Sequence, residues 1–366
     1  MNIRVHLEPS VLYETVELLY AYVNEIEPDY LTMVGSYCIP APQLKEMITK
    51  ACSDLNREDP ELQMYFKQRP IQGEQALNTC LAFCMTYCFT VLDTVDMQEQ
   101  MDRMCEKWEE LRKGGFVIRG IGRCSLDIST QTDGHPPVLA QELKKLPIEQ
   151  DFLLALLDCF SGFSYHMERL HAILQPVSQK LRQLLEPYVQ RAEPLREAWE
   201  AFFRENPPEE FVKMRMGFTP EHPFTEVDIV LRYLDSSHAP GQMDTTKNTL
   251  GLHSGVGVQP TLEPAYQKGR LTEREFAAFR LLGNKGRSQI IQALAHRFLP
   301  MQELATEMGM NPGMAFRDLN SLANAGLLIR QVRDGRCYYQ TNLPYLDAIF
   351  QHVLDFYQDG QSIQPE

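Results

Sequence analysis

The chain lacks the features that mark membrane-spanning or secreted proteins. Within its 366 residues, no uninterrupted apolar stretch approaches the roughly 20 residues that a membrane helix needs. The first ten residues alternate and carry charge, without the apolar segment of a signal peptide. The nine cysteines are an odd number at irregular spacing, which does not indicate a disulfide framework. We therefore expect a cytoplasmic protein that makes no contact with a membrane.

The chain also lacks the residue patterns of familiar enzymes. No Ser/His/Asp or Cys/His arrangement follows from the spacing of these residues. His166 and His171 are five positions apart, so they do not form the metal-ligand pair of the H-E-x-x-H motif. Two Gly-x-Gly pairs are too short for a phosphate-binding loop. We expect no enzymatic activity and no cofactor. The two histidines are expected to be ordinary surface or core residues with hydrogen-bond partners.

Positive charge is scarce in most of the chain. The net charge is −14, but residues 268–357 contain eleven Lys or Arg against eight Asp or Glu, a local balance of +3. Residues 1–267 contain 24 basic against 39 acidic residues. An acidic body repels nucleic acid, so any contact with DNA is expected in the C-terminal part alone.

The sequence predicts a mainly α fold with two domains and a short tail. Residues 1–265 are expected to form a large, acidic, mostly helical sensor or interaction domain with a few short strands. Residues 235–265 form its loop-rich linker, with one apolar strand near residues 250–258. Residues 266–358 are expected to form the second domain, and residues 359–366 the tail.

Local patterns in the first domain predict particular elements. Residues 2–10 alternate like a strand, and residues 11–26 form an amphipathic helix with Ser10 as its N-cap. Glu14 and Glu17 are placed on the polar side of that helix. Further expectations are a helix over residues 72–92, helix ends at Pro176 and Pro187, and a strand over residues 211–218.

Cys80, Cys84 and Cys88 recur every four residues and therefore share one face of a helix. Three thiolates could hold a soft ion such as arsenite or Cu(I). Cysteine is also a small residue that is often buried, and the neighbours of these three are apolar. The pattern favours a place in the core over a thiol site.

The C-terminal part has clear periodicity. Its apolar positions predict helices over residues 276–282, 286–298, 301–308, 314–324 and 346–357. Gly309 provides a turn between the third and fourth helices, and Pro312 suits the first turn of the fourth. Asp334-Gly335 predicts a tight turn between strands 328–332 and 337–341. This order of helices followed by a hairpin is that of a winged helix-turn-helix.

Three stretches of this part resemble a known family. LLGNKGRSQIIQAL is similar to the opening helix pair of the ArsR-type (arsenical-resistance repressor) regulators of bacteria. ELATEMGMNPGMAFRDLNSLANAGLLIRQVRDGRCYY is similar to their helix-turn-helix and wing, and AIFQHVLDFYQD to their last helix. The resemblance covers about residues 270–358. It implies a homodimer formed by the first and last helices of this domain, with operator DNA as the partner.

The resemblance also marks the residues that would contact DNA. They are the helix residues Asn311, Arg317 and Asn320 and the wing residues Arg330, Arg333 and Arg336. The recognition helix departs from the family, because it begins Asn-Pro-Gly-Met and places Asp318 where an acid would face DNA. Two interpretations remain open: a regulator whose DNA affinity a small molecule or protein effector modulates through the first domain, or an interaction protein without DNA binding.

Neither metal site of the family is present in this sequence. Pro300 and Gln302 stand where metal-sensing members have cysteine ligands. The positions of a second, zinc-binding site are Leu343, Tyr345, Phe356 and Asp359, of which only the last could be a ligand. The resemblance therefore implies no resident metal.

Overall fold

The computed structural model describes most of the chain. The described residues are 1–33, 35–71, 77–89, 91–122, 126–130, 132–216, 218–236, 241–244, 248–262, 271, 273–333 and 336–359. The predicted boundary near residue 265, the turn residues Asp334-Gly335 and most of the predicted tail lie outside them. Most of the described residues lie in helices, in agreement with a mainly α class.

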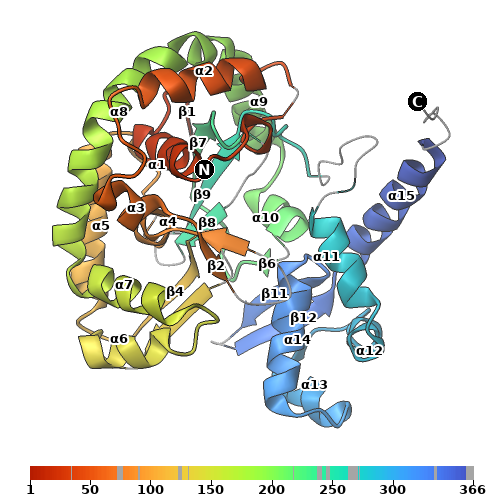
Figure 1. Ribbon diagram of the computed structural model, residues 1–366. Helices are drawn as coiled ribbons and strands as arrows, with labels where there is room; N and C mark the ends of the chain where they lie inside the picture. The colour runs from red at the N-terminus through yellow and green to blue at the C-terminus, as the bar shows by residue number, and fades with distance from the viewer. Residues whose placement is uncertain are drawn as a thin grey trace, which may run out of the picture.

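Most of the buried apolar side chains among the described residues belong to two separate hydrophobic cores. Figure 1 shows the elements of the two parts of the chain. The elements in the first part of the chain are β1 (Asn2–His6), α1 (Val11–Val23), the 3-10 helix η1 (Pro28–Tyr30), α2 (Ala41–Ala51), α3 (Pro60–Phe66), β2 (Arg69–Ile71), β3 (Leu77–Thr79), α4 (Leu81–Thr86), α5 (Met97–Leu111), β4 (Phe116–Ile121), β5 (Leu126–Thr130), α6 (Pro136–Leu143), α7 (Gln150–Ser161), α8 (Phe163–Arg191), α9 (Glu193–Glu205), α10 (Pro208–Met216), β6 (Phe218–Thr219), β7 (Glu226–Arg232), β8 (Gly241–Asp244) and β9 (Thr249–Gly255).

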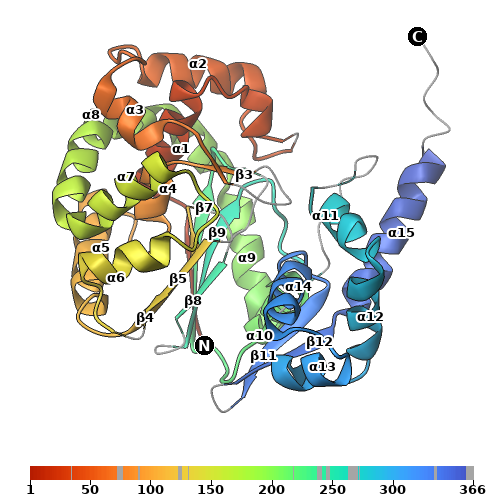
Figure 2. The same ribbon diagram turned by 60° about the horizontal axis from the view of Figure 1, so that its bottom comes forward.

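A four-stranded sheet in the order β1-β7-β9-β8 lies inside the first core. The first three strands are parallel, with His6 opposite Val230 and Val230 opposite His253, and β8 is antiparallel to β9. Strands β7 and β9 are buried along almost their whole length. Parallel strands are typically covered on both faces, and here α9 and α10 lie on the opposite side of the sheet from α1 and α8 (Figure 2).

The second core belongs to the C-terminal elements. They are α11 (Glu273–Leu282), α12 (Lys285–Ala293), β10 (Leu299–Pro300), α13 (Met301–Glu307), α14 (Pro312–Asn324), β11 (Leu328–Arg333), β12 (Arg336–Thr341) and α15 (Leu343–Asp359). Gly309 has φ +63°, so it ends α13 in the left-handed conformation that glycine adopts without strain. The predicted order of helices and strands is therefore observed in this part, with β10 as an addition.

A short strand joins the two parts of the chain. β6 extends the C-terminal hairpin into a four-stranded sheet, in the order β10-β12-β11-β6. It runs parallel to β11, with Phe218 opposite Arg330 and Thr219 opposite Gln331. The sequence did not predict this pairing, because the two strands are more than 100 residues apart and each is short.

Several predicted elements in the first part were wrong. Among the described residues of 72–92, the chain forms β3 and the short helix α4 rather than one long helix. Residues 208–216 form a helix and not a strand, because Phe211 packs against the rings of Trp199 and Phe203 on α9. A short apolar run does not distinguish the two periodicities. In the predicted linker the strand near residues 250–258 is present as β9, and β8 was missed.

Pro176 and Pro187 do not end helices as expected. Both lie inside α8, a continuous helix of 29 residues. Proline removes one backbone hydrogen bond from a helix and crowds the preceding turn. The long helix contacts α1, α2 and α5, and its apolar face is buried. This packing stabilises α8 across both prolines.

The polar side of α1 is the largest departure from the predicted first domain. Glu14 and Glu17 are both buried, and the Glu14 carboxylate accepts hydrogen bonds from Arg232 Nε (2.9 Å) and from the backbone N–H groups of Tyr233 (3.0 Å) and Leu234 (2.9 Å). Ser10 occupies the N-cap position, but its hydroxyl donates to Gln100 instead of capping the helix. The three residues that donate hydrogen bonds to Glu14 follow it in the sequence by more than 200 positions.

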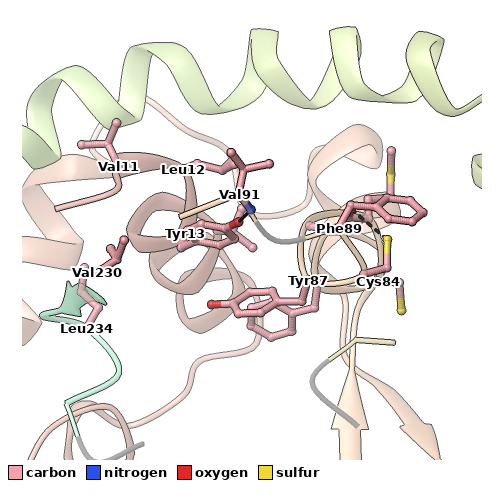
Figure 3. Packing of buried hydrophobic residues seen from close by; sticks show 14 of the residues in the cluster. Val11, Leu12, Tyr13, Cys84, Tyr87, Phe89, Val91, Val230 and Leu234 are labelled. Carbon is pink, nitrogen blue, oxygen red and sulfur yellow. Dashed lines mark hydrogen bonds between the residues drawn. The ribbon is translucent and has the colours of Figure 1, made fainter. Parts of the chain in front are cut away.

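Aromatic rings enclose the guanidinium of this buried pair. Tyr13 and Tyr87 lie near each other in the core, with ring centroids 5.1 Å apart (Figure 3). Arg232 lies near the faces of both rings and donates to the Tyr87 hydroxyl. Burial alone would lower the pKa of Arg232, but interactions with Tyr87 and Glu14 outweigh it and raise this pKa. The arginine is therefore a permanently charged group inside the core.

Candidate nucleic-acid interface

Helix α14 begins with a local capping arrangement. Asn311 has an extended backbone, and its side-chain oxygen accepts a hydrogen bond from the backbone N–H of Gly313 at 2.8 Å. Pro312 occupies the first turn, where its missing N–H group costs nothing. The oxygen of Asn311 therefore serves the helix, which reduces the capacity of this predicted site residue to read a base.

The two faces of α14 differ in character. Leu319, Leu322 and Ala323 are buried in the second core, and Ala315 is buried on the same side of the helix. On the outer face, Met314 is 50% exposed and Phe316 is 53% exposed. Arg317 is exposed, and Asn320 is half-buried. The outer face thus presents two large apolar side chains beside one basic side chain.

Asp318 does not face outward as an unpaired acid, which corrects the expectation from the sequence. Its carboxylate forms an ion pair with Arg287 of α12, with 2.9 Å between Nε and Oδ1. Both side chains are more than four-fifths buried. The cause is tertiary, because the fold places the guanidinium of Arg287, which precedes Asp318 by 31 positions, beside the acid. The negative charge at this position is balanced within the protein.

The wing carries two exposed arginines at its tip. Arg333 and Arg336 are opposite each other at the end of the β11–β12 pair. Arg333 donates to the Gln331 side chain and lies over the rings of Phe298 (5.3 Å) and Tyr338 (5.6 Å). Like charges directly opposite each other destabilise a strand pair. The arrangement concentrates positive charge at one exposed end of the strand pair.

Arg330 differs from the other two predicted wing residues. It lies in β11 between β12 and β6, opposite Tyr339 on one side and Phe218 on the other. Its side chain is half-buried, and its Nε atom is buried without a hydrogen-bond partner. Of the three arginines, it is the least accessible to a phosphate.

The three cysteines of the candidate thiol site are buried in the first core. The Cys80 sulfur accepts from the backbone N–H of Phe83, and the Cys88 thiol donates to the Met85 carbonyl. The Cys84 thiol lies 3.7 Å from the Thr79 hydroxyl. Burial raises the pKa of Cys88, which disfavours the thiolate that a soft ion requires. These contacts fit the interpretation of the three residues as part of the core.

His166 is buried and has two polar partners, of which Asp158 is exposed. Its Nδ1 atom lies 2.8 Å from the Tyr65 hydroxyl, and its Nε2 atom lies 3.3 Å from an Asp158 carboxylate oxygen. His171 is half-buried. Among the described residues, no group of three or more His, Cys, Asp or Glu could hold a metal ion. Within the same residues, no helix is both long and apolar enough to cross a membrane.

Comparison with solved structures gives partial similarities, two of which are with proteins of Mycobacterium bovis. No family model matches the chain, and no curated protein matches it. A crystal structure of a possible transcriptional regulatory protein (fragment 1–100) from Mycobacterium bovis is 29% identical, over 24% of this chain and 99% of that one, with a TM-score of 0.21.

The second similar structure is a solution NMR structure of a homodimeric winged helix-turn-helix DNA-binding domain from Mycobacterium bovis. It is described as a fragment of a possible ArsR-family transcriptional regulator. It is 24% identical, over 28% of this chain and 92% of that one, with a TM-score of 0.21. Both similarities are confined to about a quarter of this chain.

Proposed function

We propose that this protein is a dimeric, DNA-binding transcriptional regulator. Residues 266–358 would form its winged helix-turn-helix domain, and residues 1–265 a domain that modulates DNA affinity. The observation that carries the proposal is the pair of exposed arginines, Arg333 and Arg336, opposite each other at the tip of the hairpin. Phosphate contacts would relieve their mutual repulsion, which costs stability in the free protein.

Dimerisation would use the first and last helices of the C-terminal part. Helix α15 exposes the large apolar side chains of Phe350, Leu354 and Tyr357, and α11 exposes Phe276. The two helices are adjacent, since the rings of Phe279 and Phe350 lie 6.0 Å apart. Covering this apolar surface with a second copy favours association. A dimer would also present two copies of α14 to successive major grooves.

Strand β6 supports the proposal that the first domain modulates DNA affinity. It follows α10, which packs on α9 in the first core, and it pairs with the wing strand β11. A ligand that favours one arrangement of the first domain would therefore act on β11, the strand that ends at Arg333. Coupling of this kind requires that the ligand bind the two arrangements with different affinities.

The test is selection of duplexes from a random-sequence pool by the full-length protein, followed by binding titrations at two salt concentrations. We expect enrichment of a sequence that binds more tightly than a scrambled duplex. Arg333→Ala with Arg336→Ala should weaken binding to every sequence. It should also lower the slope of log affinity against log salt by about 0.9 for each phosphate that the variant no longer neutralises. Arg182→Ala with Lys144→Ala, which removes two exposed charges from the first part, is the matched control.

A second candidate function is that of an interaction protein without DNA binding. The half-exposed Met314 and Phe316 on α14 favour it, because large apolar groups on a surface often mark a protein contact. Absence of enrichment from the pool at low salt would favour this second function.

A further inference from the structure

We infer that α14 recognises thymine through its 5-methyl groups, with Met314 and Phe316 as the residues that determine specificity. The inference rests on the proposed function and names the class of DNA sequence that the protein would bind. Its basis is the set of side chains that the structure leaves available on the outer face of α14, at the end of the molecule opposite α2 (Figure 1).

The polar groups at the start of α14 are largely committed within the protein. The Asn311 oxygen caps the helix, and the Asp318 carboxylate is paired with Arg287. Pro312 and Gly313 offer no side chain that can donate or accept a hydrogen bond. The N-terminal half of a recognition helix is the part that meets base edges. In this helix, that half therefore presents mainly apolar surface.

Thymine carries an apolar group in the major groove, its C5-methyl. Met314 and Phe316 are each about half-exposed in the free protein, so contact with such methyl groups would remove apolar surface from water on both sides. Arg317, the next residue, could donate two hydrogen bonds to guanine. The preferred half-site would then combine thymine with a neighbouring guanine.

Charge favours DNA over a protein as the occupant of this face. Arg317 lies directly beside Phe316 in sequence and is exposed, and the wing adds Arg333 and Arg336. Because Arg287 balances Asp318, α14 itself adds no unpaired acid at that position. Met314 and Phe316, two positions apart on the helix, lie on either side of Arg317 around the helix axis. Apolar groups on both sides of a positive charge suit a groove in which methyl groups lie between two phosphate backbones.

The test uses the duplex that the full-length protein selects from the random pool, prepared with thymine or with deoxyuridine at every thymine position. Deoxyuridine pairs like thymine and lacks only the methyl group. We expect the protein to bind the thymine duplex more tightly, by about fourfold for each methyl group contacted. The variant with Met314→Ala and Phe316→Ala should bind both duplexes equally. Arg317→Ala should weaken binding to both duplexes, because it removes the proposed guanine contact, and should leave the ratio of the two affinities unchanged.

The outcomes separate this inference from the proposed function. Enrichment of a sequence with equal affinity for the two duplexes would overturn the inference and leave DNA binding intact. If the Met314→Ala and Phe316→Ala variant still binds the thymine duplex more tightly than the deoxyuridine duplex, other residues recognise the methyl groups. That outcome would also overturn the inference. Absence of enrichment at low salt would overturn both, and would leave Met314 and Phe316 as a surface for a protein partner.

Discussion

Replacing Arg232 by methionine should destabilise the first core strongly. Arg232 is 1% exposed and Glu14 is fully buried. The substitution keeps much of the side-chain volume but leaves the Glu14 carboxylate without its counter-charge, and Glu17 lies close by with a second carboxylate. Removal of one partner from a buried ion pair costs about 3–5 kcal/mol, because the remaining charge is neither hydrated nor paired.

The companion change, Glu14→Gln, should be milder. A glutamine oxygen can still accept a hydrogen bond from the backbone N–H group of Tyr233 or Leu234. Arg232 also keeps a counter-charge in this variant, because the Glu17 carboxylate lies 3.9 Å from its guanidinium. We expect a cost of about 1–3 kcal/mol. The double variant contains neither member of the charged pair. It should therefore be more stable than Arg232→Met alone.

Urea denaturation followed by tryptophan fluorescence measures these differences. Both tryptophans of the chain, Trp108 and Trp199, lie in the first core, so the signal reports on the region that contains the pair. With a urea dependence on the order of 2–3 kcal/mol/M, Arg232→Met should lower the midpoint by about 1–2 M. Arg103→Met breaks exposed ion pairs with Asp93 and Glu99, and should cost about 1 kcal/mol or less.

The order of the variants' free energies of unfolding tests the role of the buried ion pair. A double variant less stable than Arg232→Met would show that Glu14 is not left as an unpaired charge in the single variant. A loss of stability for Arg232→Met as small as that for Arg103→Met would show that the buried pair contributes no more than an exposed one.

Two further predictions concern pH dependence and assembly. Burial lowers the pKa of His166 by more than the nearby Asp158 raises it, so the folded state disfavours the protonated ring. As the pH falls through about 6.5, the unfolded chain gains a proton that the folded state does not accept, so the free energy of unfolding decreases until the pH reaches the lowered pKa of the folded state. Urea titrations between pH 7.5 and 5.5 should therefore show a weaker pH dependence of stability for His166→Gln than for the unchanged protein. The same pH dependence in both proteins would contradict this account. Leu354→Glu places a charge on the exposed apolar face of α15 and should convert the proposed dimer to a monomer in sedimentation experiments. Leu154→Glu, an exposed change on α7, should leave the mass unchanged. Equal masses for the two variants would exclude α15 from the interface.

Interactions between residues close in sequence determined the helices and turns of the C-terminal part. Apolar positions at helical spacing, Gly309 and Pro312 act within a few residues of themselves, and the observed helices α11 to α15 follow those signals. The exposed side of α14 and the positions of Arg333 and Arg336 at the end of the hairpin could be predicted for the same reason. Which of these residues contact DNA stays a prediction.

Only the tertiary structure decided the features that depend on distant partners. The sequence pattern places Glu14 and Asp318 on solvent-facing sides of their helices. In the structure both are largely buried, because Arg232 forms an ion pair with Glu14 and Arg287 forms one with Asp318. The sheet of β1, β7 and β9 and the pairing of β6 with the wing join segments separated by up to 224 residues. A local pattern specifies how a segment is able to fold. Whether a charged side chain can be buried does not follow from the local pattern, because it depends on which residue distant in sequence lies beside it and balances its charge.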